Sequence, residues 1–217
     1  MLAHTLLAPP CQVAGSSVEA LLEILRDDVN LASWQRQLDP AINAFANALL
    51  ASGGVLAETC TLDRDQLEAN DRVLLPGLAP AAAGIPGYAE FAADVGYLAS
   101  LFACLVDARS VGLRLRTLDK AMCPRWHVDK VPVRLITSYA GAGSEWLAEQ
   151  HSPRQQLASP AVDPYSAPAA ARRLACGEVG LLKGERWQGN EGRGLVHRSP
   201  ALGAGQRRLI VTLDWLD

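Results

Sequence analysis

Apolar side chains in the first hundred residues recur mostly at the spacing of helices. SSVEALLEILRD carries them along one face behind a serine that can cap a helix. DPAINAFANALLAS begins with Asp39 and Pro40, a cap followed by a proline at the first helical position, and ends at Gly53. YAEFAADVGYLASLFACLVDA is apolar nearly all round, which predicts a buried helix. We therefore expect residues 1–108 to be mainly helical.

The period of the pattern then changes from that of helices to that of strands. In VGLRLRTLD, apolar residues alternate with glycine and arginine, which is typical of a half-buried strand. VPVRLITSYAG, GEVGLLKGERW, GRGLVHRSP and RRLIVTLDWLD predict further strands bounded by turn residues. Residues 148–173 are polar and rich in proline, and we interpret them as a long surface loop with a short helix. Helices followed by short strands indicate an α+β domain whose strands close into a barrel or a two-sheet roll.

Length and charge narrow the class of protein. A chain of 217 residues fits one domain, with residues 1–108 as a mainly helical part and residues 109–217 as a β core. The net charge of -3 and the scattered basic residues indicate neither a nucleic-acid-binding protein nor one that binds an anionic membrane surface. No uninterrupted run of 18 apolar residues predicts a spanning helix, and no leader is evident. We expect a cytoplasmic protein whose oligomeric state the sequence leaves open.

The cysteines do not form a recognisable framework. There are five, an odd number, and no CxxC pair occurs among them. This spacing signals neither a set of disulfides nor a zinc knuckle. Idle or buried thiols in a reducing cytosol are the simplest interpretation.

Two of the four histidines are candidates for a metal site. His127 and Asp129 are two positions apart, so in a strand both side chains project to the same face. His197 lies at the edge of a later predicted strand. Two imidazoles and one carboxylate on one face of an octahedron leave three positions open, which suits a non-haem Fe(II) that must bind a co-substrate and O₂.

HVD, followed by VHRSP and GQRRLIVTLDW, resembles the HxD…H…R pattern of the Fe(II)/2-oxoglutarate-dependent oxygenases. This resemblance covers about residues 111–217. It implies a double-stranded β-helix (jelly-roll, cupin-like) barrel with helices packed outside the larger sheet. It also implies Fe(II) and 2-oxoglutarate as cofactors, with His127, Asp129 and His197 as metal ligands. The runs CPRWHVDKVPVRL, GSEWL, LLKGERW and GNEGRGLVHRSP resemble a bacterial family catalogued as domain of unknown function 1826, which carries no known activity.

A bound 2-oxoglutarate would need a fixed cation for its far carboxylate, and arginine suits this role because it binds carboxylates bidentately. Arg207 and Arg208 follow His197 on the last predicted strand. Arg208 shares its face with Ile210, and Arg207 shares its face with Leu209. A polar lumen favours Arg208, although alternation alone leaves both open. By position, Tyr139 is a candidate hydrogen-bond donor to the co-substrate.

Three hypotheses follow. The first is a dioxygenase that hydroxylates an unknown small-molecule or protein substrate, with no catalytic residues beyond the metal ligands. The second is a cupin-like zinc protein with a sensing, storage or partner-binding role, because Cys123 precedes His127 by four residues and a thiolate favours zinc. The third is a degenerate barrel without metal. Arg134 could pair with Asp129 or face a substrate.

Overall fold

The computed structural model of the protein describes residues 8–68, 75–152, 154, 157 and 170–216, which form helices, short 3-10 helices and two sheets. The helical segments are η1 (Val18–Leu25), α1 (Pro40–Ala51), α2 (Arg64–Glu68), α3 (Ala79–Ala82), α4 (Tyr88–Leu105) and η2 (Glu149–His151). The strands are β1 (Cys11–Gly15), β2 (Val29–Trp34), β3 (Ala57–Asp63), β4 (Ser110–Leu118), β5 (Val133–Ala140), β6 (Glu145–Leu147), β7 (Ala171–Arg173), β8 (Val179–Lys183), β9 (His197–Arg198) and β10 (Arg208–Leu216).

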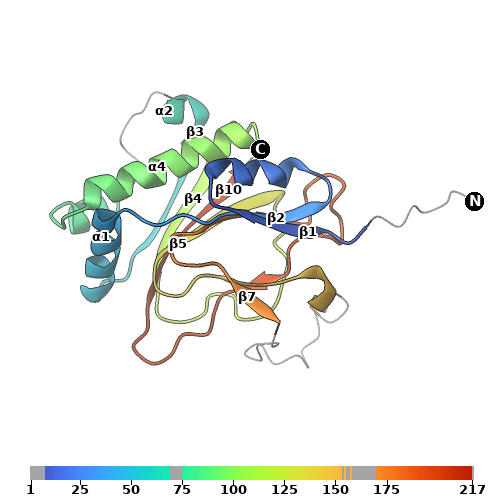
Figure 1. Cartoon of the computed structure of the whole chain (residues 1–217). Helices are drawn as coiled ribbons and strands as arrows, with labels where there is room; N and C mark the ends of the chain where they lie inside the picture. The colour runs from blue at the N-terminus through green and yellow to red at the C-terminus, as the bar shows by residue number, and fades with distance from the viewer. Residues whose placement is uncertain (1–7, 69–74, 153, 155–156, 158–169, 217) are drawn as a thin grey trace, which may run out of the picture.

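The larger sheet contains seven strands in the order β1-β2-β8-β5-β10-β4-β3, and the smaller sheet has the order β7-β6-β9. Neighbouring strands are antiparallel except β1 and β2, which run parallel. In Figure 1, α1 and α4 lie over one face of the larger sheet, and β7 of the smaller sheet lies on the other side. The described strands form two separate sheets and do not close into a hydrogen-bonded barrel. Of the two arrangements expected from the sequence, a barrel or a two-sheet roll, they agree with the second.

Strand β10 shows how the two faces of the larger sheet differ. Leu209, Val211 and Leu213 are buried in the core that includes α1 and α4. Ile210 belongs to a second apolar cluster on the opposite face, which contains Leu31, Ile136, Leu174, Leu182 and Leu195 and packs against Trp146 of the smaller sheet. Because side chains alternate along a strand, Arg208 shares the inter-sheet face with Ile210. Arg208 is buried there, between the larger sheet and the segment before β6.

Helices α1 and α4 share one core with the larger sheet. Asp39 caps α1, accepting a hydrogen bond from the Ala41 amide at 2.7 Å. Phe45 of α1 packs on Phe91 of α4, with ring centroids 4.8 Å apart, and Phe91 in turn meets Tyr139 of β5. Helix α4 is long and apolar enough to cross a membrane by length and composition alone. Its buried face packs against the sheet, as in the core helix of a globular fold.

Residues 1–108 also contain three strands that the sequence did not predict, β1, β2 and β3. Strand β2 is buried on both faces, so it lacks the alternation that marks a half-buried strand. The first expected helix is a 3-10 helix, η1. Strands β6 and β7 have only three residues each, too few for a periodic pattern. Part of the loop expected at 148–173 lies outside the described residues.

Candidate metal centre

His127 and His197 lie side by side because their backbones pair as an isolated antiparallel bridge. The His127 amide donates to the His197 carbonyl at 3.0 Å, and the His197 amide donates to the His127 carbonyl at 2.9 Å. Directly opposed residues of an antiparallel pair project to the same face. The two imidazole rings accordingly lie with centroids 4.4 Å apart.

Each imidazole is oriented by a hydrogen bond of the same kind, from Nδ1 to a backbone carbonyl. Nδ1 of His127 lies 2.9 Å from the Arg125 carbonyl oxygen, and Nδ1 of His197 lies 3.1 Å from the Leu195 carbonyl oxygen. A carbonyl oxygen can only accept, so each Nδ1 carries the hydrogen. In the neutral imidazole, Nε2 then presents a lone pair, which is the usual tautomer of a metal-ligating histidine whose other nitrogen is held by a carbonyl.

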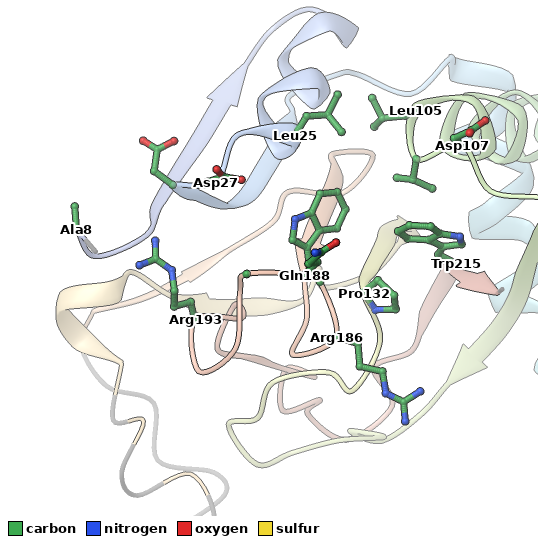
Figure 2. Close-up of a pocket in the computed structure, with 14 residues that line it drawn as sticks. Ala8, Leu25, Asp27, Leu105, Asp107, Pro132, Arg186, Gln188, Arg193 and Trp215 are labelled. Atoms are coloured by element: carbon green, nitrogen blue, oxygen red, sulfur yellow. The ribbon is translucent and has the colours of Figure 1, made fainter. Parts of the chain in front are cut away.

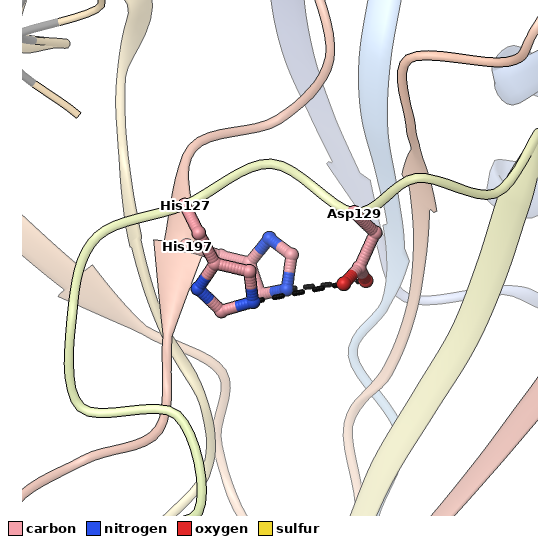
Figure 3. Close-up of side chains that lie close together, drawn as sticks. All are labelled: His127, Asp129 and His197. Atoms are coloured by element: carbon pink, nitrogen blue, oxygen red, sulfur yellow. Dashed lines mark ion pairs between the residues drawn. The ribbon is translucent and has the colours of Figure 1, made fainter. Parts of the chain in front are cut away.

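Both Nε2 atoms point at the carboxylate of Asp129 (Figure 3). Nε2 of His127 lies 3.6 Å from Oδ1, and Nε2 of His197 lies 3.3 Å from Oδ2. One ligand atom from each residue lies within 4.8 Å of the others. Two lone pairs and a carboxylate that converge in this way repel one another unless a cation lies among them, either a metal ion or a proton on an imidazole.

The electrostatics of Asp129 favour its ionised form. Burial by itself raises the pKa of this carboxyl, but the neighbouring His127, His197 and Arg134 outweigh burial and hold the pKa well below its usual range. Burial likewise acts to lower the pKa of His127, and the Asp129 carboxylate outweighs it and raises that pKa. The site therefore presents a carboxylate that is ionised across the physiological range.

Arg134 of β5 orients Asp129 from behind. Its Nη1 donates to Asp129 Oδ2 at 2.7 Å, while its Nε and Nη2 donate to the two oxygens of Asp214 at 2.6 and 3.0 Å. Asp214 is 2 % exposed and also accepts from Arg114 of β4. The chain of charges alternates in sign across three adjacent strands, so each buried charge is paired. The sequence left two roles open for Arg134, and the structure shows the first of them, the pairing with Asp129.

The segment after β8 holds the Asp129 loop by its backbone. The Glu185 amide donates to the Asp129 carbonyl at 2.9 Å, and the Gly184 amide donates to the Pro132 carbonyl at 2.9 Å. A Cβ on Gly184 would lie 2.1 Å from the Val131 oxygen and 2.5 Å from the Asp129 oxygen. Glycine is therefore required here by close approach of two backbones.

Arg208 lies on the inter-sheet face with an incomplete set of partners. Its Nη2 donates to the hydroxyls of Ser138 at 3.0 Å and Ser144 at 3.2 Å. The residue is 1 % exposed, yet Nε and Nη1 have no hydrogen-bond partner, and no carboxylate of the described residues pairs with it. Burial, and secondarily the charge of Arg173, lower its pKa to about 10. A buried cation with two unsatisfied donors is costly, which indicates a binding site for an anion.

Arg207 and Tyr139, the other candidates for binding the co-substrate, lie elsewhere. Arg207 turns to the opposite side, where it donates to the carbonyls of Leu50 and Gly54 beyond α1. Tyr139 is fully buried among the helices, and its hydroxyl donates to Asp94 Oδ2 at 2.6 Å. Since Ser138 faces Arg208, its neighbour Tyr139 faces away from it. Of the three residues proposed to bind the co-substrate, Arg208 is therefore the one that lies on the inter-sheet face.

Cys123 does not join the group formed by His127, Asp129 and His197. Among the described residues, the group whose ligand atoms lie close enough to share a metal ion contains no thiol. Cys123 is exposed, and its backbone pairs with Ser199, two residues beyond the His127–His197 bridge. Partial burial of its sulfur and the charge of Asp129 raise the pKa of the thiol.

Three residues of the site escaped the sequence interpretation. Asp214, Ser138 and Ser144 occupy ordinary strand or loop positions with no motif around them. Alternation along β10 places Asp214 on the same face as Arg208, so this residue could have been found. Ser144 could not, because only the packing of the smaller sheet on the larger one brings it to Arg208.

Solved structures of oxygenases share this arrangement of sheets and helices. Dioxygenase for auxin oxidation 1 from Arabidopsis thaliana, in its complex with 2-oxoglutarate, matches with a TM-score of 0.51 and 10% sequence identity, over 96% of this chain and 92% of that one. A Shewanella oneidensis protein described as a candidate oxygenase matches with a TM-score of 0.50 and 9% identity, over 95% and 89% of the two chains. The chain has an oxygenase-like fold.

Family membership follows from the sequence. The model of the family described as "Protein of unknown function (DUF1826)" matches residues 15–214. The chain therefore belongs to the DUF1826 family. No curated protein matches it.

Proposed function

We propose that the protein is an Fe(II)- and 2-oxoglutarate-dependent dioxygenase built on a double-stranded β-helix. The observation that carries this proposal is Arg208, whose buried guanidinium keeps two donors without a partner on the inter-sheet face. A dicarboxylate chelated at the metal centre needs such a cation for its second carboxylate. The likeness to the A. thaliana dioxygenase with 2-oxoglutarate supports the fold on which this assignment rests.

The residues present fit the two cofactors. His127, Asp129 and His197 would hold the metal through two Nε2 atoms and a carboxylate oxygen, a donor set that suits Fe(II) with open positions. Arg208 would bind the far carboxylate of 2-oxoglutarate, with Ser138 and Ser144 fixing its guanidinium. When bound, the iron would activate O₂, the oxidant, and 2-oxoglutarate would supply two of the electrons as it is converted to succinate and CO₂, which allows hydroxylation of a substrate.

The chain itself supplies position and charge. The carbonyls of Arg125 and Leu195 keep the hydrogens on Nδ1, so both Nε2 lone pairs stay available. His127, His197 and Arg134 together keep Asp129 ionised, and Arg134 also fixes the direction of its carboxylate. The second apolar cluster, with Ile136, Ile210 and Leu182, lies on the face of the sheet that carries Arg208 and limits the water near it.

The substrate, a small molecule or a protein side chain, and a cytoplasmic location belong to the same proposal. The zinc hypothesis was based on a thiolate ligand from Cys123. This residue lies outside the group of candidate ligands, so it does not support that hypothesis. Zinc at the same three residues is an outcome that the metal assay below distinguishes.

The test begins with protein purified without oxygen and assayed for iron and zinc. We expect stoichiometric Fe(II) binding, a visible charge-transfer band when 2-oxoglutarate is added to the Fe(II) protein, and O₂-dependent release of succinate. Arg208→Met should abolish the band and the succinate, whereas Arg207→Met is the matched control and should preserve both. Tight zinc binding with no 2-oxoglutarate binding by the iron-loaded protein would contradict the proposal.

A further inference from the structure

A cavity lies outside the metal centre, and none of the three candidate metal ligands lines it. It is a cleft of about 1060 Å³ between η1, the end of α4, the end of β10 and the segment after β8 (Figure 2). Its apolar wall includes Leu25, Leu105 and Pro132, together with the rings of Trp187 and Trp215. The two rings meet edge to face with centroids 6.3 Å apart. This volume and these rings fit a small organic molecule with an aromatic body.

The arginines of the cleft lack anionic partners. Arg193 and Arg186 both line it, and neither forms an ion pair with a described residue. The Nε of Arg193 is buried and has no hydrogen-bond partner. Figure 2 shows the guanidinium of Arg193 extending from its loop towards the segment that carries Asp27. An unsatisfied guanidinium donor in a cavity indicates a ligand that can accept from it.

The aspartates of the cleft do not cancel this positive charge. Asp28 is held by Arg26 through two hydrogen bonds of 3.0 and 2.7 Å, and Asp107 is held by Arg64 at 2.6 Å. Asp27 is the lining carboxylate that forms no ion pair with the described residues. The unpaired charges of the lining are therefore Arg186 and Arg193 against Asp27.

A buried lysine adds to the positive charge. Lys183 is 1 % exposed and has its Nζ over the ring of Trp187, 4.7 Å from the centroid. That Nζ donates to the Arg26 carbonyl at 2.5 Å. The charge of Lys183 therefore lies against the ring of Trp187. It would attract an anion in the cleft electrostatically, with little screening by water.

From these contacts, we propose that the cleft binds an organic anion with an aromatic body, its ring against Trp187 and its charge on Arg193. The class includes aryl carboxylates and aryl sulfonates. The site is separate from the metal centre, and it would exist whether or not the protein is a dioxygenase.

The probe for this site is 8-anilinonaphthalene-1-sulfonate, titrated by fluorescence against the full-length protein without metal or 2-oxoglutarate. Its neutral parent, N-phenyl-1-naphthylamine, has the same rings without the sulfonate. We expect the anion to bind at least about tenfold more tightly than the neutral parent, and Arg193→Met to remove that difference. We also expect energy transfer from tryptophan to the bound dye, reduced in Trp187→Phe.

Two control variants make the result specific. Arg116→Met changes an arginine of β4 outside the cleft, and Arg208→Met removes the cation of the other anion site; both should retain wild-type affinity for the dye. Urea denaturation of each variant verifies that it is folded. Equal affinity for the two probes, unchanged binding in folded Arg193→Met, or loss of binding in Arg208→Met would each overturn the proposal. Because no metal is present, these outcomes are independent of the dioxygenase assay.

Discussion

His127 and His197, far apart in the sequence, exchange both of their backbone hydrogen bonds, and this pairing sets their Nε2 atoms beside Asp129. If these three residues bind a divalent metal, the folded state gains free energy that the unfolded chain does not. At a hundredfold excess over the Kd, the gain is about 2.7 kcal/mol. Thermal denaturation with and without Fe(II) or Zn(II) measures it as a higher midpoint.

His127→Gln, Asp129→Asn and His197→Gln should each lose most of this gain. His151→Gln is the control, since His151 is exposed on η2 outside the group of candidate ligands. A metal-induced shift that survives in Asp129→Asn would place the ion elsewhere.

Arg208→Met should separate stability from ligand binding. The wild-type guanidinium is buried with two unpaired donors, and methionine of similar length removes the charge while it keeps most of the packing. We expect the metal-free variant to be more stable by about 1–3 kcal/mol in urea denaturation, although it loses two hydrogen bonds to serine. A less stable variant would mean that Arg208 stabilises the fold, and it would contradict a role for its unpaired donors in binding an anion.

Arg134→Met should weaken metal binding by about 10–100-fold, the usual cost of losing a group that orients a ligand. The physical reason is that Asp129 Oδ2 loses the donor that fixes the carboxylate. Arg114→Met is the matched control, because Arg114 also donates to Asp214 but does not contact Asp129. Titration with Co(II), followed by its visible spectrum, measures both affinities and reports the coordination geometry, which a general loss of stability would not alter.

Gly184→Ala should disturb the metal centre indirectly, by displacing the backbone that carries Asp129. The added methyl group overlaps the carbonyl oxygens of Val131 and Asp129, so the segment that carries Asp129 must move. We expect a loss of about 1–3 kcal/mol in stability and weaker Co(II) binding. Gly84→Ala meets nothing within 4 Å and should stay within about 0.5 kcal/mol of the wild type. Equal behaviour of the two variants would refute the close approach.

Cys123→Ala should leave the affinities for Fe(II) and Zn(II) unchanged within error. The thiol lies outside the group of candidate ligands, and its surroundings raise its pKa. Metal titration of the two proteins side by side measures the difference. Loss of zinc binding in this variant would restore the zinc hypothesis.

The local pattern of the sequence determined those elements that are long and one-sided. Helix α1 with its Asp39 cap, helix α4, and strands β4, β5, β8 and β10 all lie where periodicity and capping residues predict them. The expectation of a polar lumen favoured Arg208 over Arg207, although alternation along β10 alone left both open. The two-residue spacing made Asp129 a candidate neighbour of His127, although this segment forms an isolated bridge and a loop and not the expected strand. Each of these conclusions depends only on residues a few positions apart, which is the range over which the periods of helices and strands operate.

Tertiary structure decided the rest. Strand β2 is buried on both faces, so its sequence has no alternation that predicts a strand. It is a strand because it pairs with β1 and β8. Tyr139 pointed away from the site because the helices, not the smaller sheet, cover its face of β5. The bridge that joins His127 to His197, the pairing of Arg134 with both Asp129 and Asp214, and the unpaired donors of Arg208 all depend on contacts between distant strands. Hydrogen bonds and burial across such distances have no period in the sequence, so only the folded chain specifies them.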